Sequence, residues 1–326
     1  MTAPVGPGAG APRRVLVVGS AGQDGSILVE RLSAEGCALV GLDRGVAQSV
    51  GGAPDAVGVA LGDRDAVRAL VSRFAPDEIY YLAAHHHSSE EGPGADLAET
   101  FHAMTSVHVS WLVDVLEAVR QSAPRARVVY ASSSHVFGEP STSTQDESTP
   151  IAPTGIYGIT KAAGMHACAF YRRRGVEASS VILYNHESPR RRGTFVSQRI
   201  VQGARRALEN EHAGERFSLR LGRLDAVVDW GYAPDYVDAM LRVARLEPGR
   251  AGDFVVATGV PHTVRDFAAA AFSAVGLDWR EYVEEDSSLL RQGLPVLVGD
   301  ASKLRAATGW RPSVTFDEMV EILIRG

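Results

Sequence analysis

The chain has 326 residues, of which 45% are hydrophobic, and a formal net charge of −6. This length suits about two domains, and the acidic balance excludes the basic footprint that nucleic acid or an anionic membrane surface attracts. No apolar run is long enough to cross a bilayer, and the two cysteines, Cys37 and Cys168, form no disulfide framework or zinc motif. We expect a cytoplasmic protein with two buried thiols that binds neither nucleic acid nor membrane.

Strand and helix patterns alternate from Arg13 onward, after residues 1–12, which are rich in Ala, Pro and Gly. Residues 1–12 lack the regions of a signal peptide, and we expect a disordered leader. Short apolar runs predict strands at residues 15–18, 38–42, 57–61, 79–82, 127–131, 178–184 and 254–257. Helical spacing predicts helices at residues 27–33, 66–74, 107–120 and 196–208. Such alternation is typical of an α/β fold whose parallel sheet is covered on both faces.

A glycine-rich turn, with Gly19, Gly22 and Gly25, stands between the first expected strand and the first helix. Glycines let the backbone approach a pyrophosphate, and the helix N-terminus supplies N–H groups and a positive dipole. The order of strand, loop and helix favours a dinucleotide site over an ordinary glycine turn. The other expected cofactor contacts near this turn and the fourth strand are Gln23, Asp24, Leu82 and Ala83.

Acidic residues at two strand ends bear on the identity of the cofactor. Asp43 ends the second strand, where a carboxylate binds both ribose hydroxyls of NAD and repels the 2′-phosphate of NADP. Arg44 follows and could pair with that phosphate, so we favour NAD while NADP stays open. Asp63 is placed to reach the adenine amino group, or else to cap the helix that begins near residue 66.

We therefore predict a doubly wound Rossmann domain over residues 13–184, with return segments near 224–259. After residue 184 the regular alternation of strand and helix patterns ends. A basic loop at residues 188–192 then leads into the helix at 196–208. A second, smaller α/β substrate domain is expected from discontinuous pieces, residues 185–223 and 260–326.

Tyr157 and Lys161 are four residues apart and share one face of a helix. There the lysine ammonium can stabilise a phenolate, which can take a proton from a sugar hydroxyl. The alternative is an ordinary helix with an exposed lysine. The glycine loop and a Ser-Ser-Ser-His run at residues 132–135 favour the catalytic interpretation.

Together these residues resemble the extended short-chain dehydrogenases/reductases, specifically the GDP-mannose 4,6-dehydratases. The resemblance covers nearly everything after residue 13. Its most specific pieces are Gly22-Gln-Asp-Gly-Ser26, Asn185-His-Glu-Ser-Pro-Arg-Arg191, and Leu224-Asp-Ala226 with Asp229-Trp-Gly231. It implies a domain that holds NAD(P), a C-terminal domain that holds a nucleotide-diphosphate sugar, and oxidation at sugar C4.

The resemblance also implies roles for single residues. Tyr157 would be the base, Lys161 its partner and Ser133 the hydroxyl that bonds O4. Arginines beside a serine also suit a diphosphate, although a solvated basic loop is the alternative. The expected substrate contacts are Ser134, His87, Asn185, Glu187, Ser188, Arg191, Phe195, Val196, Arg199, Arg220 and Arg223.

One departure from the family pattern concerns the net reaction. The dehydratases carry Thr-Ser-Glu where this chain has Ser133, Ser134 and His135, so the carboxylate that moves the C5 proton is absent. We therefore favour net C4 epimerisation, or release of a 4-keto sugar. The alternative is 4,6-dehydration with His135 as acid and base, since a pKa of about 6.5 suits that work. A role in which His135 only shapes the pocket is also open, and a non-catalytic dinucleotide-binding protein is an alternative of another class.

Three further departures concern ligands and assembly. Val227 and Val228 replace a pair whose arginine touches the diphosphate, so GDP is less certain and Arg220 or Arg223 would compensate. Three consecutive histidines at residues 85–87 suggest a metal, but neighbours at a strand end point in different directions, and we expect none. The loop after Asp43 is short and lacks the Arg-Arg-Ser-Ser stretch of family tetramers. A homodimer is therefore expected, through the helix at 107–120 and the Tyr157 helix.

Overall fold

A seven-stranded sheet forms the centre of the computed structural model, which describes residues 11–326 except 44–45, 52, 54–58, 86–95 and 287–295. The strand order is β10-β6-β5-β4-β1-β2-β3. All neighbours pair in parallel except β2 and β3. The strands are β1 (Arg14–Val18), β2 (Ala38–Asp43), β3 (Val46–Val50), β4 (Glu78–Tyr81), β5 (Arg127–Ser133), β6 (Glu177–Leu183) and β10 (Asp253–Val256). This topology confirms the predicted Rossmann-like α/β architecture.

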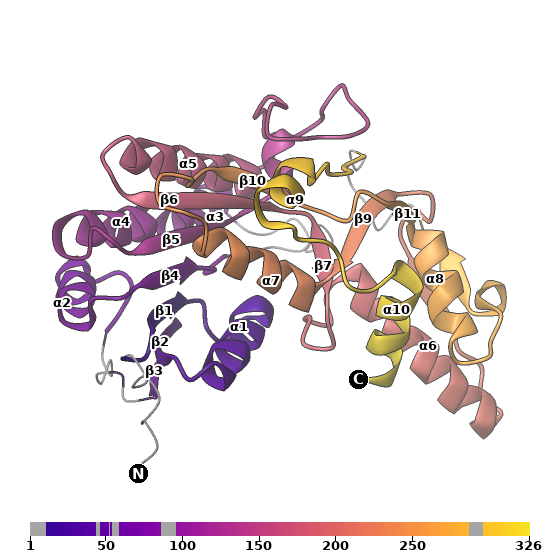
Figure 1. The fold of residues 1–326 in the computed structure, drawn as a ribbon. Coiled ribbons are helices and arrows are strands. Elements are labelled where there is room, and N and C mark those ends of the chain that lie inside the picture. Colours follow the sequence, from indigo (N-terminus) through magenta and orange to yellow (C-terminus); the bar gives the residue numbers. More distant parts are fainter. Residues whose placement is uncertain (1–10, 44–45, 52, 54–58, 86–95, 287–295) are drawn as a thin grey trace, which may run out of the picture.

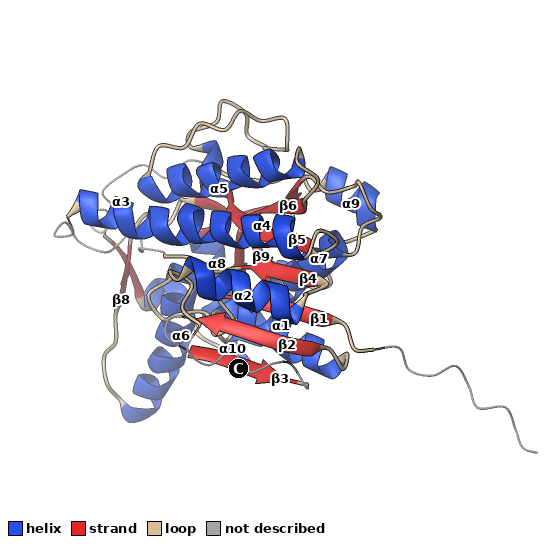
Figure 2. Cartoon of the chain, turned by 90° about the vertical axis from the view of Figure 1, so that its left-hand side faces the viewer, coloured by secondary structure: helices blue, strands red, loops and turns tan. Residues whose placement is uncertain are grey.

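Helices cover both faces of this sheet (Figures 1 and 2). One face carries α1 (Gln23–Ala34) and α7 (Ala233–Ala244), which pack on each other. The central strands are buried on both faces, which is why they read as continuous apolar runs. The other face carries α2 (Arg64–Phe74), α4 (Trp111–Ser122) and α5 (Ile156–Arg172), with α3 (Leu97–Thr105) and the π-helical turn η1 (Ser106–Ser110) leading into α4.

The third strand is where the sequence prediction was wrong. Residues 59–61 of the expected strand 57–61 are not in a strand, and residues 54–58 lie outside the described part of the chain. The strand next to β2 at the edge of the sheet is instead β3, which pairs antiparallel with β2. An antiparallel neighbour needs only a short turn, whereas a parallel one needs a long crossover. The chain therefore turns back directly after Asp43.

A second unit packs beside the carboxyl ends of the main strands (Figure 1). It has its own hydrophobic cluster, which includes Trp230, Phe267 and Phe272. Its strands are β7 (Asn185–Glu187), β9 (Val227–Tyr232) and β11 (Pro261–Thr263) in one sheet, and β8 (Leu219–Leu221) with β12 (Val283–Glu285) in another. Its helices are α6 (Val196–Ala213), α8 (Val264–Ser273), α10 (Phe316–Arg325) and the short η3 (Trp279–Glu281).

The boundary between the two units is interleaved along the chain. The sequence division placed all of residues 260–326 in the second unit. However, Ala301, Leu304 and Trp310, in and beside α9 (Ser302–Thr308), belong to the hydrophobic cluster of the main sheet. The last segment of the chain therefore crosses back over the Rossmann unit before α10 returns to the second unit.

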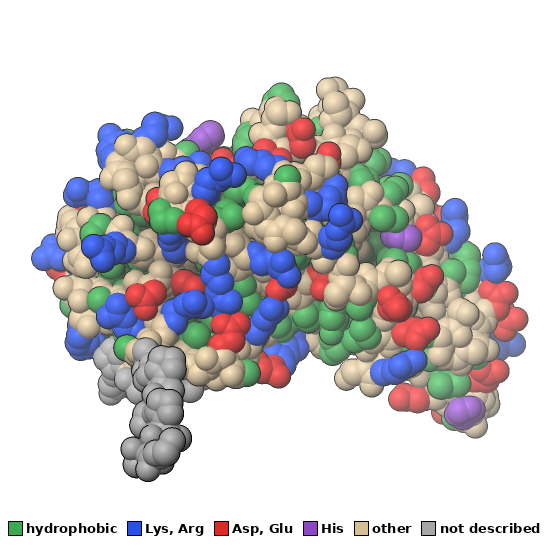
Figure 3. All heavy atoms as spheres, in the orientation of Figure 1, with side chains coloured by type: hydrophobic (Ala, Val, Ile, Leu, Met, Phe, Trp, Pro, Cys, Tyr) green, Lys and Arg blue, Asp and Glu red, His purple; other side chains and the backbone are tan. Residues whose placement is uncertain are grey.

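The surface charges and the two cysteines do not point to a particular ligand or partner. Acidic and basic side chains are interspersed over the face shown in Figure 3. Cys37 and Cys168 are buried and unpaired. Within the described ranges, no helix combines the length and apolarity needed to span a membrane. Likewise, no group of three or more His, Cys, Asp or Glu residues in that part of the chain could hold a metal ion.

Candidate active site

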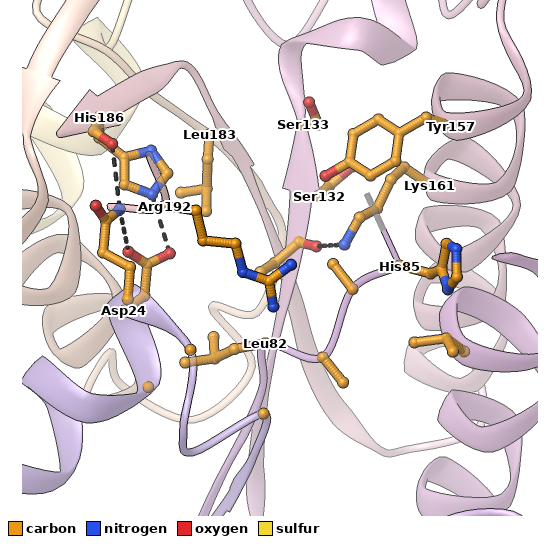
Figure 4. A pocket seen from close by; sticks show the side chains of 18 of the residues that line it. Asp24, Leu82, His85, Ser132, Ser133, Tyr157, Lys161, Leu183, His186 and Arg192 are labelled. Carbon is orange, nitrogen blue, oxygen red and sulfur yellow. Dashed lines mark hydrogen bonds and ion pairs between the residues drawn. The ribbon is translucent and has the colours of Figure 1, made fainter. Parts of the chain in front are cut away.

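A cavity of about 430 Å³ lies at the carboxyl ends of the parallel strands, where the second unit meets the sheet (Figure 4). This is the edge at which doubly wound sheets bind ligands. It brings together residues from β2, β5, α1 and α5 and from the segments that follow β1, β4 and β6. The predicted residues that line it are Gly19, Gly22, Gln23, Asp24, Gly25, Asp43, Leu82, Ala83, Ser133, His135, Tyr157, Lys161, Asn185, Arg191 and Phe195.

The glycine loop fits a dinucleotide pyrophosphate. Gly19 has φ of 90°, and a Cβ there would lie 2.7 Å from the Ala83 nitrogen. A Cβ on Gly25 would lie 2.1 Å from the Gly19 carbonyl oxygen. Helix α1 begins after Gly22 without a side-chain cap, so its first N–H groups face the loop without such an acceptor. Close backbone approach and an uncapped helix terminus are the features that a bound diphosphate requires.

Two acidic residues of the expected cofactor site have different positions. The Asp43 carboxylate lines the cavity and accepts a hydrogen bond of 3.0 Å from the Ala21 N–H, which links β2 to the glycine loop. Asp63 does not line the cavity, and its carboxylate caps α2 by accepting 3.0 Å from the Ala66 N–H. Arg44 lies outside the described residues.

Tyr157, Lys161 and Ser133 meet at the inner end of the cavity (Figure 4). Lys161 is 2% exposed, and its ammonium donates 2.7 Å to the Ala131 carbonyl of β5. The Lys161 nitrogen lies 5.7 Å from the centroid of the Tyr157 ring. Ser133, at the end of β5, hydrogen-bonds Tyr157 and also accepts 3.3 Å from the His135 N–H. Helix α5 and strand β5 therefore hold a phenol, an ammonium and a hydroxyl together.

Burial dominates the protonation of this pair in the protein alone. It raises the pKa of Tyr157 to about 12, which Arg191 and the Ser133 hydrogen bond only partly offset. It lowers the pKa of Lys161 to about 7, against the opposing effect of Asp24. In the protein alone, burial therefore opposes the Tyr157 phenolate more than its neighbours favour it. A further positive charge near the phenol is needed to lower the pKa of Tyr157.

Two imidazole rings contact Tyr157 edge to face. The His135 ring centroid lies 5.7 Å from that of Tyr157 and the His108 centroid 5.4 Å. His135 is open to the cavity, yet protein surrounds it at longer range and lowers its pKa, which favours a neutral ring. His108 is fully buried in the π-helical turn, between the Thr160 hydroxyl at 2.8 Å and the His85 N–H at 3.1 Å. The sequence analysis missed His108.

The two most specific sequence motifs bond to each other. His186 donates from Nε2 to the Asp24 carboxylate at 2.9 Å and from Nδ1 to the Tyr184 carbonyl at 2.7 Å. The Gln23 amide bonds Asp24 at 3.1 Å and the His186 carbonyl at 3.2 Å, and the Ser188 hydroxyl donates 2.9 Å to Gln23. These contacts, which we call the clasp, join the start of α1 to β7 (Figure 4).

The three consecutive arginines of the basic loop have different surroundings. Arg190 bonds Glu30 and Ser26 on the outer side of α1. The Arg191 guanidinium lies 3.5 Å from the Glu187 carboxylate and 3.6 Å from the Phe195 ring centroid. Arg192 reaches across the cavity between Leu82 and Leu183 (Figure 4). Within the described chain, the Arg192 side chain has no hydrogen bond or ion pair, while its backbone carbonyl accepts 3.2 Å from the Phe195 N–H.

Several expected substrate contacts lie away from the cavity lining. Arg220 pairs with Asp286 and Arg223 with Asp225, so neither is placed to compensate for Val227 and Val228 at the cavity. His87 lies outside the described residues. The remaining expected residues that do not line the cavity are Ser134, Glu187, Ser188, Val196 and Arg199.

Further lining residues were not among the sequence predictions. His186 lies within the family motif at residues 185–191, and Arg192 lies within the basic loop at residues 188–192. The sequence therefore contained a signal for both residues. Trp111 and Val107 had no local signal, because they face the cavity from the helix that packs beside α5. The complete set of additional lining residues is Ala21, Leu61, Ala84, His85, Val107, Trp111, Ala131, Ser132, Leu183, Tyr184, His186, Arg190, Arg192 and Thr194.

Comparison with known proteins places this site in a family. The family model described as GDP-mannose 4,6 dehydratase matches residues 16–323. The chain is 35% identical to GDP-mannose 4,6 dehydratase 2 of Arabidopsis thaliana, over 96% of this chain and 86% of that protein. It is 31% identical to GDP-mannose 4,6-dehydratase of Yersinia enterocolitica, over 96% and 93%.

Solved structures show the same fold with nicotinamide cofactors. UDP-glucose 4-epimerase of Thermus thermophilus, in complex with NAD, is 26% identical with a TM-score of 0.77, over 96% of this chain and 98% of that chain. dTDP-glucose 4,6-dehydratase of Bacillus anthracis, also with NAD, is 19% identical with a TM-score of 0.76, over 96% of each chain. Since the family model spans nearly the whole sequence, the chain belongs to the GDP-mannose 4,6 dehydratase family and is an NAD(P)-dependent enzyme of the nucleotide-sugar epimerase and dehydratase group.

Proposed function

We propose that the enzyme oxidises the C4 hydroxyl of a nucleotide-diphosphate sugar, and that C4 epimerisation or release of the 4-keto sugar is the net result. The observation that carries this proposal is the meeting of Tyr157, Ser133 and Lys161 at the inner end of the cavity. Among the described lining residues, the carboxylates are Asp24 and Asp43, and both belong to the cofactor side. The described lining residues therefore place no further carboxylate beside Tyr157 for elimination.

The proposed mechanism begins at the phenol. Bound nicotinamide supplies the hydride acceptor and a positive charge near the site. Tyr157 takes the proton of O4 as the C4 hydrogen leaves as hydride, and the Ser133 hydroxyl donates to the developing ketone oxygen. Lys161, anchored on Ala131, favours the phenolate electrostatically. Epimerisation returns both hydrogens with the hydride on the opposite face, whereas release of the ketone leaves the cofactor reduced.

A second candidate is 4,6-dehydration, and the position of His135 favours it. This imidazole is open to the cavity beside Tyr157, and its lowered pKa keeps it neutral and able to accept a proton. It would take the C5 proton of the 4-keto sugar and give it to the departing C6 hydroxyl, so that water leaves. Hydride would then add to C6 while C5 takes up a proton that comes from solvent, which completes the 6-deoxy-4-keto sugar. The dehydratase names of the relatives point the same way.

Substrate and cofactor selection are proposed from the charged residues of the cavity. Arg191 and Arg192 would hold the diphosphate of the sugar nucleotide, and the second unit would form the substrate domain. GDP-mannose is the first substrate to test because the relatives are named for it. Asp43 at the end of β2 favours NAD over NADP.

We also propose a cytoplasmic homodimer. Two buried, unpaired thiols suit a reducing compartment. Exposed apolar side chains lie on α3 and α5, which pack together on one side of the molecule (Figure 2). These side chains are Leu97, Phe101, Ile159 and Phe170. An interface formed with their copies would cover them.

Mass spectrometry of products in heavy water distinguishes the net reactions. The protein is incubated with NAD and a panel of nucleotide sugars that includes GDP-mannose. Unchanged mass with new stereochemistry and no deuterium at C5 supports epimerisation. A product lighter by one water, with solvent deuterium on the sugar, supports dehydration through His135. Unchanged substrate with every sugar, without even transient near-ultraviolet absorbance of reduced cofactor, would favour the non-catalytic alternative.

Replacement of Tyr157 by Phe tests the base directly. The variant should lose reduction of bound NAD by substrate by at least about a hundredfold, because no phenol remains to take the O4 proton. Tyr171→Phe, on the same helix but outside the cavity lining, is the matched control and should keep its rate. Full activity of Tyr157→Phe would refute the assignment.

A further inference from the structure

The carboxylate of Asp24 stands in an electrostatically unfavourable place for an anionic cofactor. Asp24 is in the first turn of α1, lines the cavity, and adjoins the uncapped N-terminus that fits a pyrophosphate. A carboxylate stabilises a helix N-terminus by itself. It also repels a diphosphate that is to bind the same terminus. The site therefore needs a positive charge that cancels Asp24 without occupying the anion position.

His186 is placed to supply that charge. Both of its ring nitrogens face oxygen atoms that can only accept: the Tyr184 carbonyl at 2.7 Å and the Asp24 carboxylate at 2.9 Å. Two such acceptors require two N–H donors, and an imidazole with both is the cation. The ring is 7% exposed and stacks on Tyr236 at 4.6 Å between centroids. It approaches Asp24 from β7, 162 residues away in sequence.

The charges around His186 support this protonation state. Burial by itself would lower the pKa of His186, but the Asp24 carboxylate outweighs it and raises that pKa, while Arg191 opposes. Burial is likewise outweighed for Asp24, whose pKa the His186 charge lowers. Glu187 on β7 also faces the pair, and burial raises its pKa. From α7 the neighbour is the Tyr236 ring, whose pKa burial raises well above its usual value. From α5, Tyr157 and Lys161 are coupled to Asp24, whose charge acts to raise the pKa of each.

We propose that protonated His186 is a built-in counter-charge that neutralises Asp24 and thereby permits the cofactor diphosphate to bind at the N-terminus of α1. This role rests on dinucleotide binding at that terminus and is independent of the chemistry at the sugar. It makes His186 and Asp24 positioning residues. It also explains why the second unit reaches back to the glycine loop through the clasp.

Titration calorimetry of NAD and NADH binding to charge variants tests the proposal. His186→Gln leaves Asp24 uncompensated and should weaken binding about tenfold, the effect of about 1.4 kcal/mol. The double variant Asp24→Asn with His186→Gln removes both charges and should return to within about threefold of the wild type. Arg31→Gln, which removes an α1 cation paired with Asp238 outside the cavity, is the control for general charge effects.

Comparison of the double and single variants separates this role from a purely structural one. If the clasp acts only as a mechanical link, the double variant will bind as weakly as His186→Gln or more weakly, and that result would overturn the proposal. Rescue in the double variant supports it.

The pH dependence of the same binding needs no change at His186. Wild-type affinity should fall as the pH rises through the raised pKa of His186, because the counter-charge is then lost. Asp24→Asn should remove most of that fall, since no carboxylate remains to be compensated. Equal pH dependence in the two proteins would contradict the proposal even if His186→Gln does not fold.

Discussion

Three histidines of the site have different roles because their neighbours differ. His186 faces two acceptors and must donate from both nitrogens. His108 receives the His85 N–H on Nε2 and donates from Nδ1 to Thr160, whose own proton goes to helix carbonyls, so it is neutral. His135 is open to the cavity, where substrate would decide its role. One residue type therefore provides a charge, a rigid support and a candidate acid–base group.

Variants of His135 should separate oxidation from elimination. His135→Ala should keep reduction of bound NAD by substrate within about tenfold, because Tyr157, Lys161 and Ser133 remain, while any dehydration falls by about a hundredfold or more. His135→Glu restores a carboxylate and should raise dehydration. Mass spectrometry of the products checks both changes. Unchanged dehydration in His135→Ala would remove His135 from the mechanism.

Lys161 should make stability depend on pH. Its native pKa of about 7 is below the value of about 10.4 in an unfolded chain. Between these values the unfolded chain binds the extra proton, so the free energy of unfolding rises with pH from about 7 to about 10. Lys161→Met should lack this component. Urea unfolding of both proteins at pH 7 and pH 9 checks it, and a constant difference between them would contradict the expectation.

At the scale of elements, the glycine loop and α1 pack tightly against each other. The loop runs from β1 into α1, and the close approach of Gly25 to the Gly19 carbonyl leaves no room for a side chain. The same loop is tied to β2 through Asp43 and to β7 through the clasp. Any displacement of α1 therefore moves both the helix N-terminus that fits a pyrophosphate and the second unit.

Gly25→Ala tests this fit. The added Cβ would lie 2.1 Å from the Gly19 oxygen, so α1 must shift. We expect a loss of about 1–3 kcal/mol in stability and weaker NAD binding. Gly252→Ala is the matched control, since the nearest atom to its Cβ would be 3.7 Å away. Thermal unfolding and calorimetry measure the two effects, and a Gly25→Ala protein that behaves like the control would refute the constraint.

At the scale of the molecule, two hydrophobic clusters are joined across the cavity. The Rossmann cluster and the smaller cluster around Trp230 are connected by segments that cross between them. The glycine loop and the basic loop at residues 188–192 meet between these clusters, so a cofactor and a sugar nucleotide would be held by one set of contacts. The face that carries α3 and α5 is the proposed interface with a second copy of the chain.

Glutamate at exposed apolar positions should distinguish a dimer from a monomer. Phe101→Glu with Phe170→Glu places charges on α3 and α5, where burial against a copy would cost several kcal/mol. The wild type should elute at twice the chain mass in light scattering, and the double variant as a monomer. Val260→Glu, exposed in the second unit, is the control and should stay dimeric. A monomeric wild type would contradict the interface.

The amino-acid sequence by itself determined the Rossmann architecture, the position of the glycine loop, the pairing of Tyr157 with Lys161 on one helix, and the family. These features are encoded by local patterns of a few residues or by motifs of contiguous residues. Only the tertiary structure showed that His186 opposes Asp24, that β3 replaces the expected third strand, and that Arg220 and Arg223 have acidic partners of their own. Such contacts join residues that are far apart in the sequence, and they therefore produce no periodic pattern in it. Local spacing therefore predicts helices and loops, whereas the charge balance of the site depends on which distant side chains packing brings together.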